Sequence, residues 1–125
     1  MRFREELPPG CPPDDAVEIN QPRVVYRLAR TLPPSEDDFM SQRAEKPGQS
    51  FSGVSECQAR GLSVHEDRAD SERAAKLPAL RGRHVCRLLL SAGAGRILQT
   101  GKPSHHTWWP YANYDVLACF EGDNS

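Results

Sequence analysis

Proline is the residue that most restricts what this chain can fold into. Of its 125 residues 11 are proline, and the first four lie close together as Pro8-Pro9 and Pro12-Pro13. Proline locks φ and has no amide hydrogen, so it is excluded from helix interiors and central strands. Residues 1–22 are therefore predicted to form an extended arm, which either wraps around the domain or stays mobile.

The remaining chain has the length of a single domain. Residues 23–125 are predicted to form one α+β domain, with a small mixed or antiparallel sheet of about five strands and two or three short helices. Runs of β-branched and aromatic residues predict strands over 23–30, 62–65, 84–90, 96–100 and 114–120. Helices are predicted over 35–39, 55–60 and 67–77, with Ser35 and Ser55 as N-caps and Gly61 as a left-handed terminator.

Alternation along the first strand predicts which of its faces is buried. Val24, Tyr26 and Leu28 share one face, which we expect to point into the core. Arg27 then points away from that core or into a cleft. The strand over 84–90 is expected to lie in the centre of the sheet. Residues 43–52 and 101–103 are expected to be loops, and the loop 101–103 leads into the segment 104–110.

Charge and hydropathy exclude two classes of partner. The 16 basic and 17 acidic residues give a formal net charge of -1, which offers no general attraction to nucleic acid. No apolar run approaches the roughly 20 residues that span a bilayer, so no membrane partner is predicted. The N-terminus has no apolar segment typical of a signal peptide, and we therefore expect a cytoplasmic protein.

The four cysteines, Cys11, Cys57, Cys86 and Cys119, have long and irregular spacings. Because no CxxC motif and no export signal occurs, they are predicted to be free thiols. The adjacent His105 and His106 point to opposite sides of an extended chain and are not expected to bind one ion. No metal site is therefore predicted, unless the fold gathers Cys57, His65, Cys86 and one of those histidines.

The segment 104–114 is unusually rich in aromatic residues. Trp108, Trp109 and Tyr111 follow directly after the two histidines. Together with Tyr26 they would suit a flat polar ligand such as a nucleobase or nicotinamide. Alternatively, the two tryptophans fill the core beneath a loop, and the sequence leaves both interpretations open.

Several short motifs also occur in a particular order. Tyr26-Arg27 on the first strand is followed by Asp38-Phe39-Met40-Ser41, by Gly61-Leu62-Ser63-Val64-His65 and by Arg83-His84-Val85, which leads on to Gly95-Arg96-Ile97. This order, over roughly residues 24–100, resembles the split β-sheet core of ADP-ribosyltransferase-like proteins, which hold NAD between two small sheets. The resemblance implies that Arg27 and Ser63 contact NAD. The late glutamate of that family has no clear counterpart, so His105 or His106 would replace it.

Two classes of function follow. Because no complete catalytic set is found, the chain is predicted to be a small soluble binding or accessory protein that takes up a ligand or a protein partner, such as the partner of a toxin or defence system. Residues 1–22 would provide the contact, since polar proline-rich segments often become ordered on binding. The alternative is an NAD-using transferase or hydrolase, resembling a toxin-like effector, with catalytic residues Arg27, Ser63, His65, His105 and His106.

Overall fold

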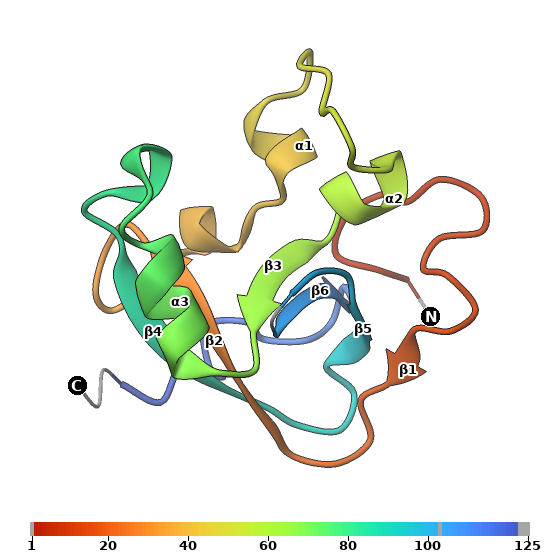
Figure 1. Ribbon diagram of the computed structural model, residues 1–125. Helices are drawn as coiled ribbons and strands as arrows, with labels where there is room; N and C mark the ends of the chain where they lie inside the picture. Colours follow the sequence, from red (N-terminus) through yellow and green to blue (C-terminus); the bar gives the residue numbers. More distant parts are fainter. Residues whose placement is uncertain (1, 103, 123–125) are drawn as a thin grey trace.

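A computed structural model of the chain describes residues 2–102 and 104–122. Met1 of the predicted arm, residues 123–125 of the predicted domain and Pro103 of the predicted 101–103 loop lie outside the described residues. Within them one antiparallel six-stranded sheet is accompanied by short helices, which confirms the α+β prediction. The strands are β1 Val17–Glu18, β2 Arg23–Ala29, β3 Leu62–His65, β4 His84–Leu90, β5 Gly95–Gln99 and β6 His105–Pro110. The helices are η1 Glu36–Phe39, α1 Gln42–Glu45, α2 Glu56–Ala59, α3 Arg68–Ala74 and η2 Pro78–Leu80 (Figure 1).

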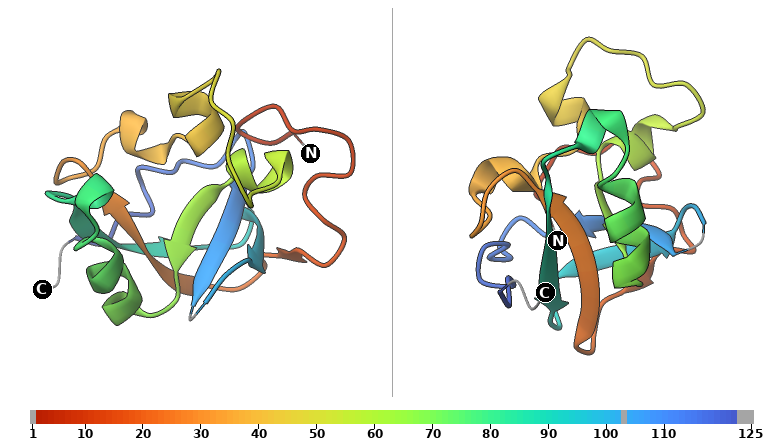
Figure 2. Two further views of the ribbon diagram at one scale, coloured as in Figure 1. Left: turned by 45° about the horizontal axis from the view of Figure 1, so that its top comes forward. Right: turned by 60° about the vertical axis from the view of Figure 1, so that its left-hand side comes forward.

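The sheet curls around its core because of the way its strands are connected. The strand order is β1-β5-β6-β3-β2-β4, yet β1 continues into β2 through residues 19–22 and β4 into β5 through residues 91–94. Backbone hydrogen bonds from Ile19 to Gly95 (2.9 Å) and from Gly93 to Ile19 (3.2 Å) link these connections at the bend. In Figure 2, β2 and β4 cross the direction of β5 and β6. The sheet therefore has a concave inner face, which holds the core.

The segment 104–110, expected to follow a loop, contains the strand β6 in the interior of the sheet. It pairs with β3 on one side and with β5 on the other. The close approach of β5 requires glycine at its start: Gly95 has φ +129, and a Cβ there would lie 2.1 Å from the carbonyl oxygen of Trp109. Threonine and tryptophan favour strands, and both Trp108 and Trp109 are buried. The interpretation of the tryptophans as core residues is thus confirmed.

Two predictions about the opposite end of the sheet are wrong. The strand β4 lies at the edge rather than in the centre. The predicted last strand, 114–120, consists mainly of turns and meets β4 only through the bridge between Leu88 and Phe120. The carboxylate of Asp115 explains the difference, because its Oδ1 accepts hydrogen bonds from the backbone of Leu117 (3.1 Å) and Ala118 (3.2 Å) and so bends the chain.

The buried face of β2 is also the opposite of the predicted one. Val25 and Ala29 are buried on the inner face, which they share with Arg27, whereas Val24, Tyr26 and Leu28 are only partly buried. Both faces of this strand carry apolar side chains, because α3 packs against the outer one. The alternation of residues along β2 therefore could not identify the face that points into the core.

The helix caps were predicted better than the helix lengths. Ser55 caps α2 by accepting a hydrogen bond from the backbone of Gln58 (3.1 Å), and Ser35 stands at the N-cap of η1. The helix predicted over 67–77 ends already at Ala74, and α1 occupies the start of the predicted 43–52 loop. These helices are too short for propensity alone to define their ends.

Gly61 is required for space and not for a left-handed backbone. Its φ is not positive, so the prediction of a left-handed terminator is wrong. A Cβ at this position would lie 2.3 Å from Cγ2 of Thr107 and 3.0 Å from Nε1 of Trp109. Glycine therefore allows the start of β3 to pass closely over β6.

The N-terminal arm wraps around the domain, as one of the two alternatives predicted. Phe3 forms a backbone bridge to Tyr111, and the carboxylate of Glu5 accepts hydrogen bonds from the backbone (3.0 Å) and hydroxyl (2.5 Å) of Ser41. Further along, Ile19 is buried in the core. The arm is thus part of the folded domain.

The arm is also fastened covalently, which corrects the prediction of four free thiols. Cys11 and Cys57 form a disulfide that joins the arm to α2. Spacing along the chain could not indicate this pair, because wrapping of the arm brings the two residues together. Cys86 and Cys119 are buried thiols, and burial raises the pKa of Cys119 to about 12.

The predicted cytoplasmic location stays a prediction. Disulfides persist mainly in oxidising compartments, so the Cys11–Cys57 bond weighs against it. None of the helices in the described part of the chain is long and apolar enough to cross a membrane.

Opening the disulfide is expected to destabilise the fold strongly. The bond closes a loop with a sequence separation of 46, for which the chain-entropy model gives a stabilisation of about 4 kcal/mol. Urea unfolding with and without a thiol reductant measures this difference. The Cys11→Ala/Cys57→Ala variant serves as the control and should match the reduced wild type in both conditions. An unfolding midpoint of the wild type that does not respond to reductant would contradict the prediction.

Candidate functional site

The sheet separates the residues that the sequence singled out into two groups. Alternation along the paired strands puts Arg27, His106 and Trp108 on the inner face. The outer-face residues are Tyr26, Ser63, His65, His105 and Trp109. One ligand therefore cannot touch both groups without passing through the sheet.

Arg27 is held by the backbone of its own protein. Its guanidinium donates hydrogen bonds to three carbonyl oxygens, those of Asp38 (2.9 Å), Ser63 (2.7 Å) and Met40 (3.3 Å). Burial lowers the pKa of Arg27 to about 10, and the nearby carboxylate of Glu45 partly opposes this effect. The side chain is thus a cation at neutral pH that joins β2, β3 and the end of η1.

The carboxylate of Asp38 belongs to the same support. It is buried, and burial by itself acts to raise its pKa. The backbone N–H groups of Arg30 (2.7 Å) and Ser35 (2.9 Å) and the hydroxyl of Thr31 (3.1 Å) donate to it and hold the pKa below its ordinary value. Asp38 therefore fixes the turn after β2.

Three aromatic side chains of the segment 104–114, those of Trp108, Trp109 and Tyr111, are covered by protein. Nε1 of Trp108 donates to the carbonyl of Ala94 (3.0 Å), and Nε1 of Trp109 donates to that of Cys57 (2.9 Å). The hydroxyl of Tyr111, which is also buried, donates to Glu18 (2.6 Å). Their polar atoms are satisfied internally, so these rings offer no exposed platform for a flat ligand.

The outer face brings two of the predicted residues together. His65 and His105 stand directly opposite each other on β3 and β6, with ring centroids 5.4 Å apart and planes at 79°. Nδ1 of His65 lies 3.1 Å from the hydroxyl of Ser71, and Nδ1 of His105 lies 3.0 Å from that of Thr100. Burial, followed by neighbouring positive groups, lowers the pKa of both imidazoles.

His106 makes separate contacts on the inner face. Its Nδ1 donates to the carbonyl of Ser104 (2.7 Å), and its Nε2 lies 3.4 Å from Glu66. Glu66 in turn accepts two hydrogen bonds from the guanidinium of Arg23 (2.9 and 2.6 Å). As predicted, the adjacent histidines do not point at the same place.

The fold does not gather the metal ligands that the sequence analysis left open. Cys57 is bonded to Cys11, while Cys86 lies on the inner face, away from His65. In the part of the chain that the structure describes, no group of three or more His, Cys, Asp or Glu residues is arranged to hold a metal ion.

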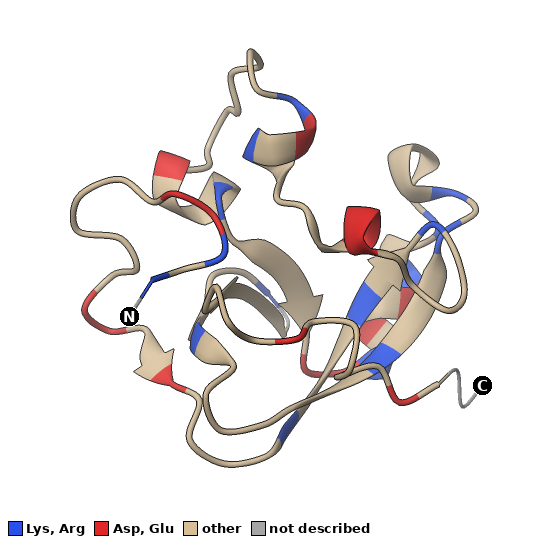
Figure 3. Cartoon of the chain, turned by 180° about the vertical axis from the view of Figure 1, so that it is seen from behind, with Lys and Arg blue, Asp and Glu red and all other residues tan. Residues whose placement is uncertain are grey.

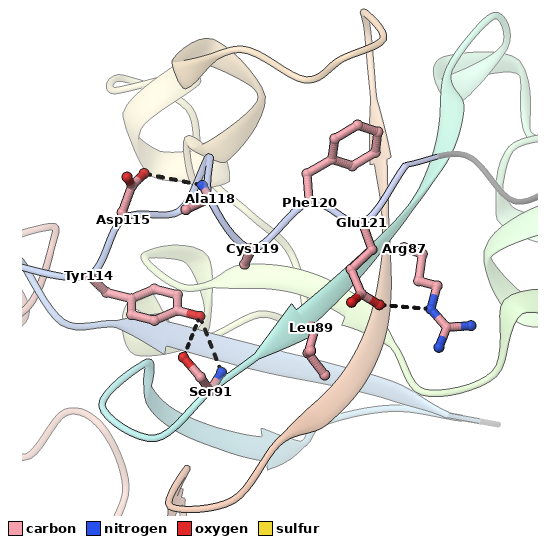
Figure 4. A pocket seen from close by; sticks show the side chains of 9 residues that line it. All are labelled: Arg87, Leu89, Ser91, Tyr114, Asp115, Ala118, Cys119, Phe120 and Glu121. Atoms are coloured by element: carbon pink, nitrogen blue, oxygen red, sulfur yellow. Dashed lines mark hydrogen bonds and ion pairs between the residues drawn. The ribbon is translucent and has the colours of Figure 1, made fainter.

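A groove that the sequence analysis did not predict lies beside the edge strand β4. Its volume is about 720 Å³. Figure 4 shows an ion pair between Arg87 and Glu121 (3.1 Å) on one side. On the other side, the backbone N–H of Ser91 donates to the hydroxyl of Tyr114 (3.2 Å), and the two hydroxyl groups share a further hydrogen bond (3.2 Å). The other lining residues are Leu89, Asp115, Ala118, Cys119 and Phe120.

The sequence carried only an indirect signal for this groove. Asp115 begins a turn whose carboxylate caps the following backbone, and such a residue marks the end of a strand. Recognising that turn would have placed residues 114–121 beside the sheet instead of in it. The edge position of β4, which creates the other wall, depends on long-range pairing.

Comparisons of the chain with protein-family models, with curated proteins and with solved structures found no match. The likeness to ADP-ribosyltransferase-like proteins therefore stays a prediction.

Replacing Arg27 is expected to lower stability. Arg27→Met removes the donor of three carbonyl oxygens, of which those of Asp38 and Met40 are partly buried and that of Ser63 is exposed. A buried group left unsatisfied costs about 1–3 kcal/mol and a solvated one less, so we expect the free energy of unfolding in urea to fall by about 2 kcal/mol. Arg81→Met, at an exposed position, is the matched control and should change the free energy of unfolding by less than about 0.5 kcal/mol. An equally small effect at Arg27 would show that its hydrogen bonds do not support the fold.

The two outer-face histidines should make stability depend on pH. An unfolded chain takes up a proton on each imidazole near pH 6.5, whereas burial keeps His65 and His105 neutral to lower pH in the folded state. Protons thus favour the unfolded chain, and the free energy of unfolding should decrease as the pH falls below about 6.5, until the folded pKa values are passed.

Urea unfolding between about pH 8 and pH 5 measures this decrease. The double variant His65→Asn/His105→Asn should show a flatter curve, while His84→Asn, at an exposed position, should retain the wild-type slope. A double variant with the full wild-type slope in this interval would mean that other groups are responsible.

Proposed function

We propose that this chain is a binding or accessory protein whose partner occupies the groove beside β4. The observation that carries the proposal is the groove itself, formed by an edge strand and the segment Tyr114–Glu121. Its volume of about 720 Å³ falls within the range of about 300–1,000 Å³ that is usual for binding sites.

The composition of the groove favours a segment of a protein over a small molecule. The apolar side chain of Leu89 lies between a charged pair on one side and a pair of hydroxyl groups on the other, and Phe120 also lines the groove. An apolar centre with a polar rim is typical of protein interfaces. The C-terminal segment already binds the edge of β4, through backbone hydrogen bonds from Leu89 to Cys119 (2.8 Å) and from Glu121 to Arg87 (2.9 Å), so a partner segment would contact the groove mainly through side chains.

The groove replaces the N-terminal arm as the proposed contact. The arm is held by the Cys11–Cys57 disulfide, by the bridge from Phe3 to Tyr111 and by Glu5. A segment fastened in this way is already ordered and does not fold on a partner.

The NAD-using alternative has less support. Ser63, His65 and His105 do share the outer face, but Arg27 lies on the inner face with its N–H groups bonded to carbonyl oxygens. Catalysis requires acid, base and binding groups to converge on one reacting atom, and a sheet layer separates these residues.

A pair of matched substitutions tests the proposal. Ala118 is exposed and lines the groove, whereas Ala112 is exposed and does not line it. Ala118→Arg places a long charged side chain in the groove, and Ala112→Arg adds the same side chain elsewhere. Each immobilised protein is used to capture partners from an extract of its source cells, with quantification by mass spectrometry.

We expect the wild type to capture a protein whose amount falls at least about tenfold with Ala118→Arg. The reason is that blocking a central contact typically removes more than about 1.4 kcal/mol of binding free energy. Ala112→Arg should retain it. Equal capture by both variants would contradict the groove as the binding surface. A rise in melting temperature with NAD, with no partner lost in Ala118→Arg, would favour the enzyme instead.

A further inference from the structure

The facing histidines of the outer face are arranged in a way that the proposed partner binding does not use. His65 and His105 come from strands that meet only in the folded chain. Both rings are partly exposed, so solutes can reach them. Their surroundings decide what these two rings can bind.

The hydroxyl groups beside the two rings allow the proton of each neutral ring to lie on Nδ1. The hydroxyl of Ser71 points to the carbonyl of Tyr26 (3.5 Å), so toward His65 it acts as an acceptor for Nδ1–H. Thr100 lies between Nδ1 of His105 (3.0 Å) and the hydroxyl of Thr107 (2.8 Å), and can accept from the ring while donating to Thr107.

With both protons on Nδ1, each ring presents the lone pair of its Nε2 atom. The described residues provide no hydrogen-bond partner for either Nε2. Metal-binding histidines typically donate their other ring N–H to an oxygen atom in this way.

We propose that Nε2 of His65 and Nε2 of His105 bind a late first-row divalent cation such as Zn²⁺ or Ni²⁺. Imidazole nitrogen suits these ions, whereas Mg²⁺ and Ca²⁺ prefer oxygen. A tetrahedral ion about 2.1 Å from each nitrogen places the two ring centroids roughly 5 Å apart, close to the observed 5.4 Å.

The neighbouring charged groups limit the site to these two ligands. Asp70 is bonded to Ser104 (2.6 Å) and paired with Arg73, and Glu66 is paired with Arg23 and His106. Two protein ligands leave coordination positions for water or for a donor atom of another molecule. The ion is therefore an accessible one rather than a structural ion in a closed site.

Titration of tag-free protein with Zn²⁺ and Ni²⁺, followed by calorimetry at about pH 7.5, tests this site. His65→Asn and His105→Asn remove Nε2 while the amide can still donate to Ser71 or Thr100, so the fold is preserved; melting curves verify this. We expect one ion per chain and at least about tenfold weaker binding in either variant. Mg²⁺ should not compete.

Two further histidines serve as controls. His84→Asn changes an exposed histidine on β4 and should leave the affinity unchanged. His106→Asn distinguishes the cross-strand pair from the adjacent pair His105-His106 and should also retain binding. Wild-type affinity in His65→Asn or His105→Asn, loss of binding in His84→Asn, or no binding by the wild type would overturn the proposal. Ala118→Arg should bind the ions normally, so the result is independent of the proposed function.

Discussion

The guanidinium of Arg27 is the contact on which the arrangement of the core depends. It points inward from β2, between Val25 and Ala29, where an apolar side chain would be expected. A charge at such a position is tolerated only if its donors are satisfied. They are satisfied by carbonyl oxygens of β3, of the end of η1 and of Met40, which follows it, so one side chain joins β2 to β3 and to η1.

This attachment determines what covers the concave face. The carbonyls of Asp38 and Met40 that Arg27 binds flank Phe39, which is fully buried in the core. On the far side, Val116 and Cys119 of the C-terminal segment complete the same core. The C-terminal segment passes beside β4 to reach it, and the groove forms between the two (Figures 1 and 4).

Many charged residues of the surface are paired with a residue of opposite sign. Glu56 is bonded to both Arg43 and Arg60, whose hydrogen bonds lower its pKa to about 2. Figure 3 shows that blue and red segments alternate over much of the chain. Exposed pairs of this kind contribute little to stability. Groups of opposite sign therefore lie close together at several places on the described surface.

Features that depend on neighbouring residues were determined by the sequence. The strands β2, β3 and β4 and the caps of η1 and α2 lie where the residues predicted them, because strand propensity and capping act within a few residues.

The tertiary structure alone decided which residues meet. It made Arg27 an inward-facing support, placed β6 in the interior of the sheet and β4 at its edge, and paired Cys11 with Cys57 and His65 with His105. Each of these results depends on long-range pairing in a curled sheet. A strand with apolar side chains on both faces has no preferred core side until its neighbours are present. No local sequence pattern could therefore reveal the side-chain direction, the strand order or the two residue pairs.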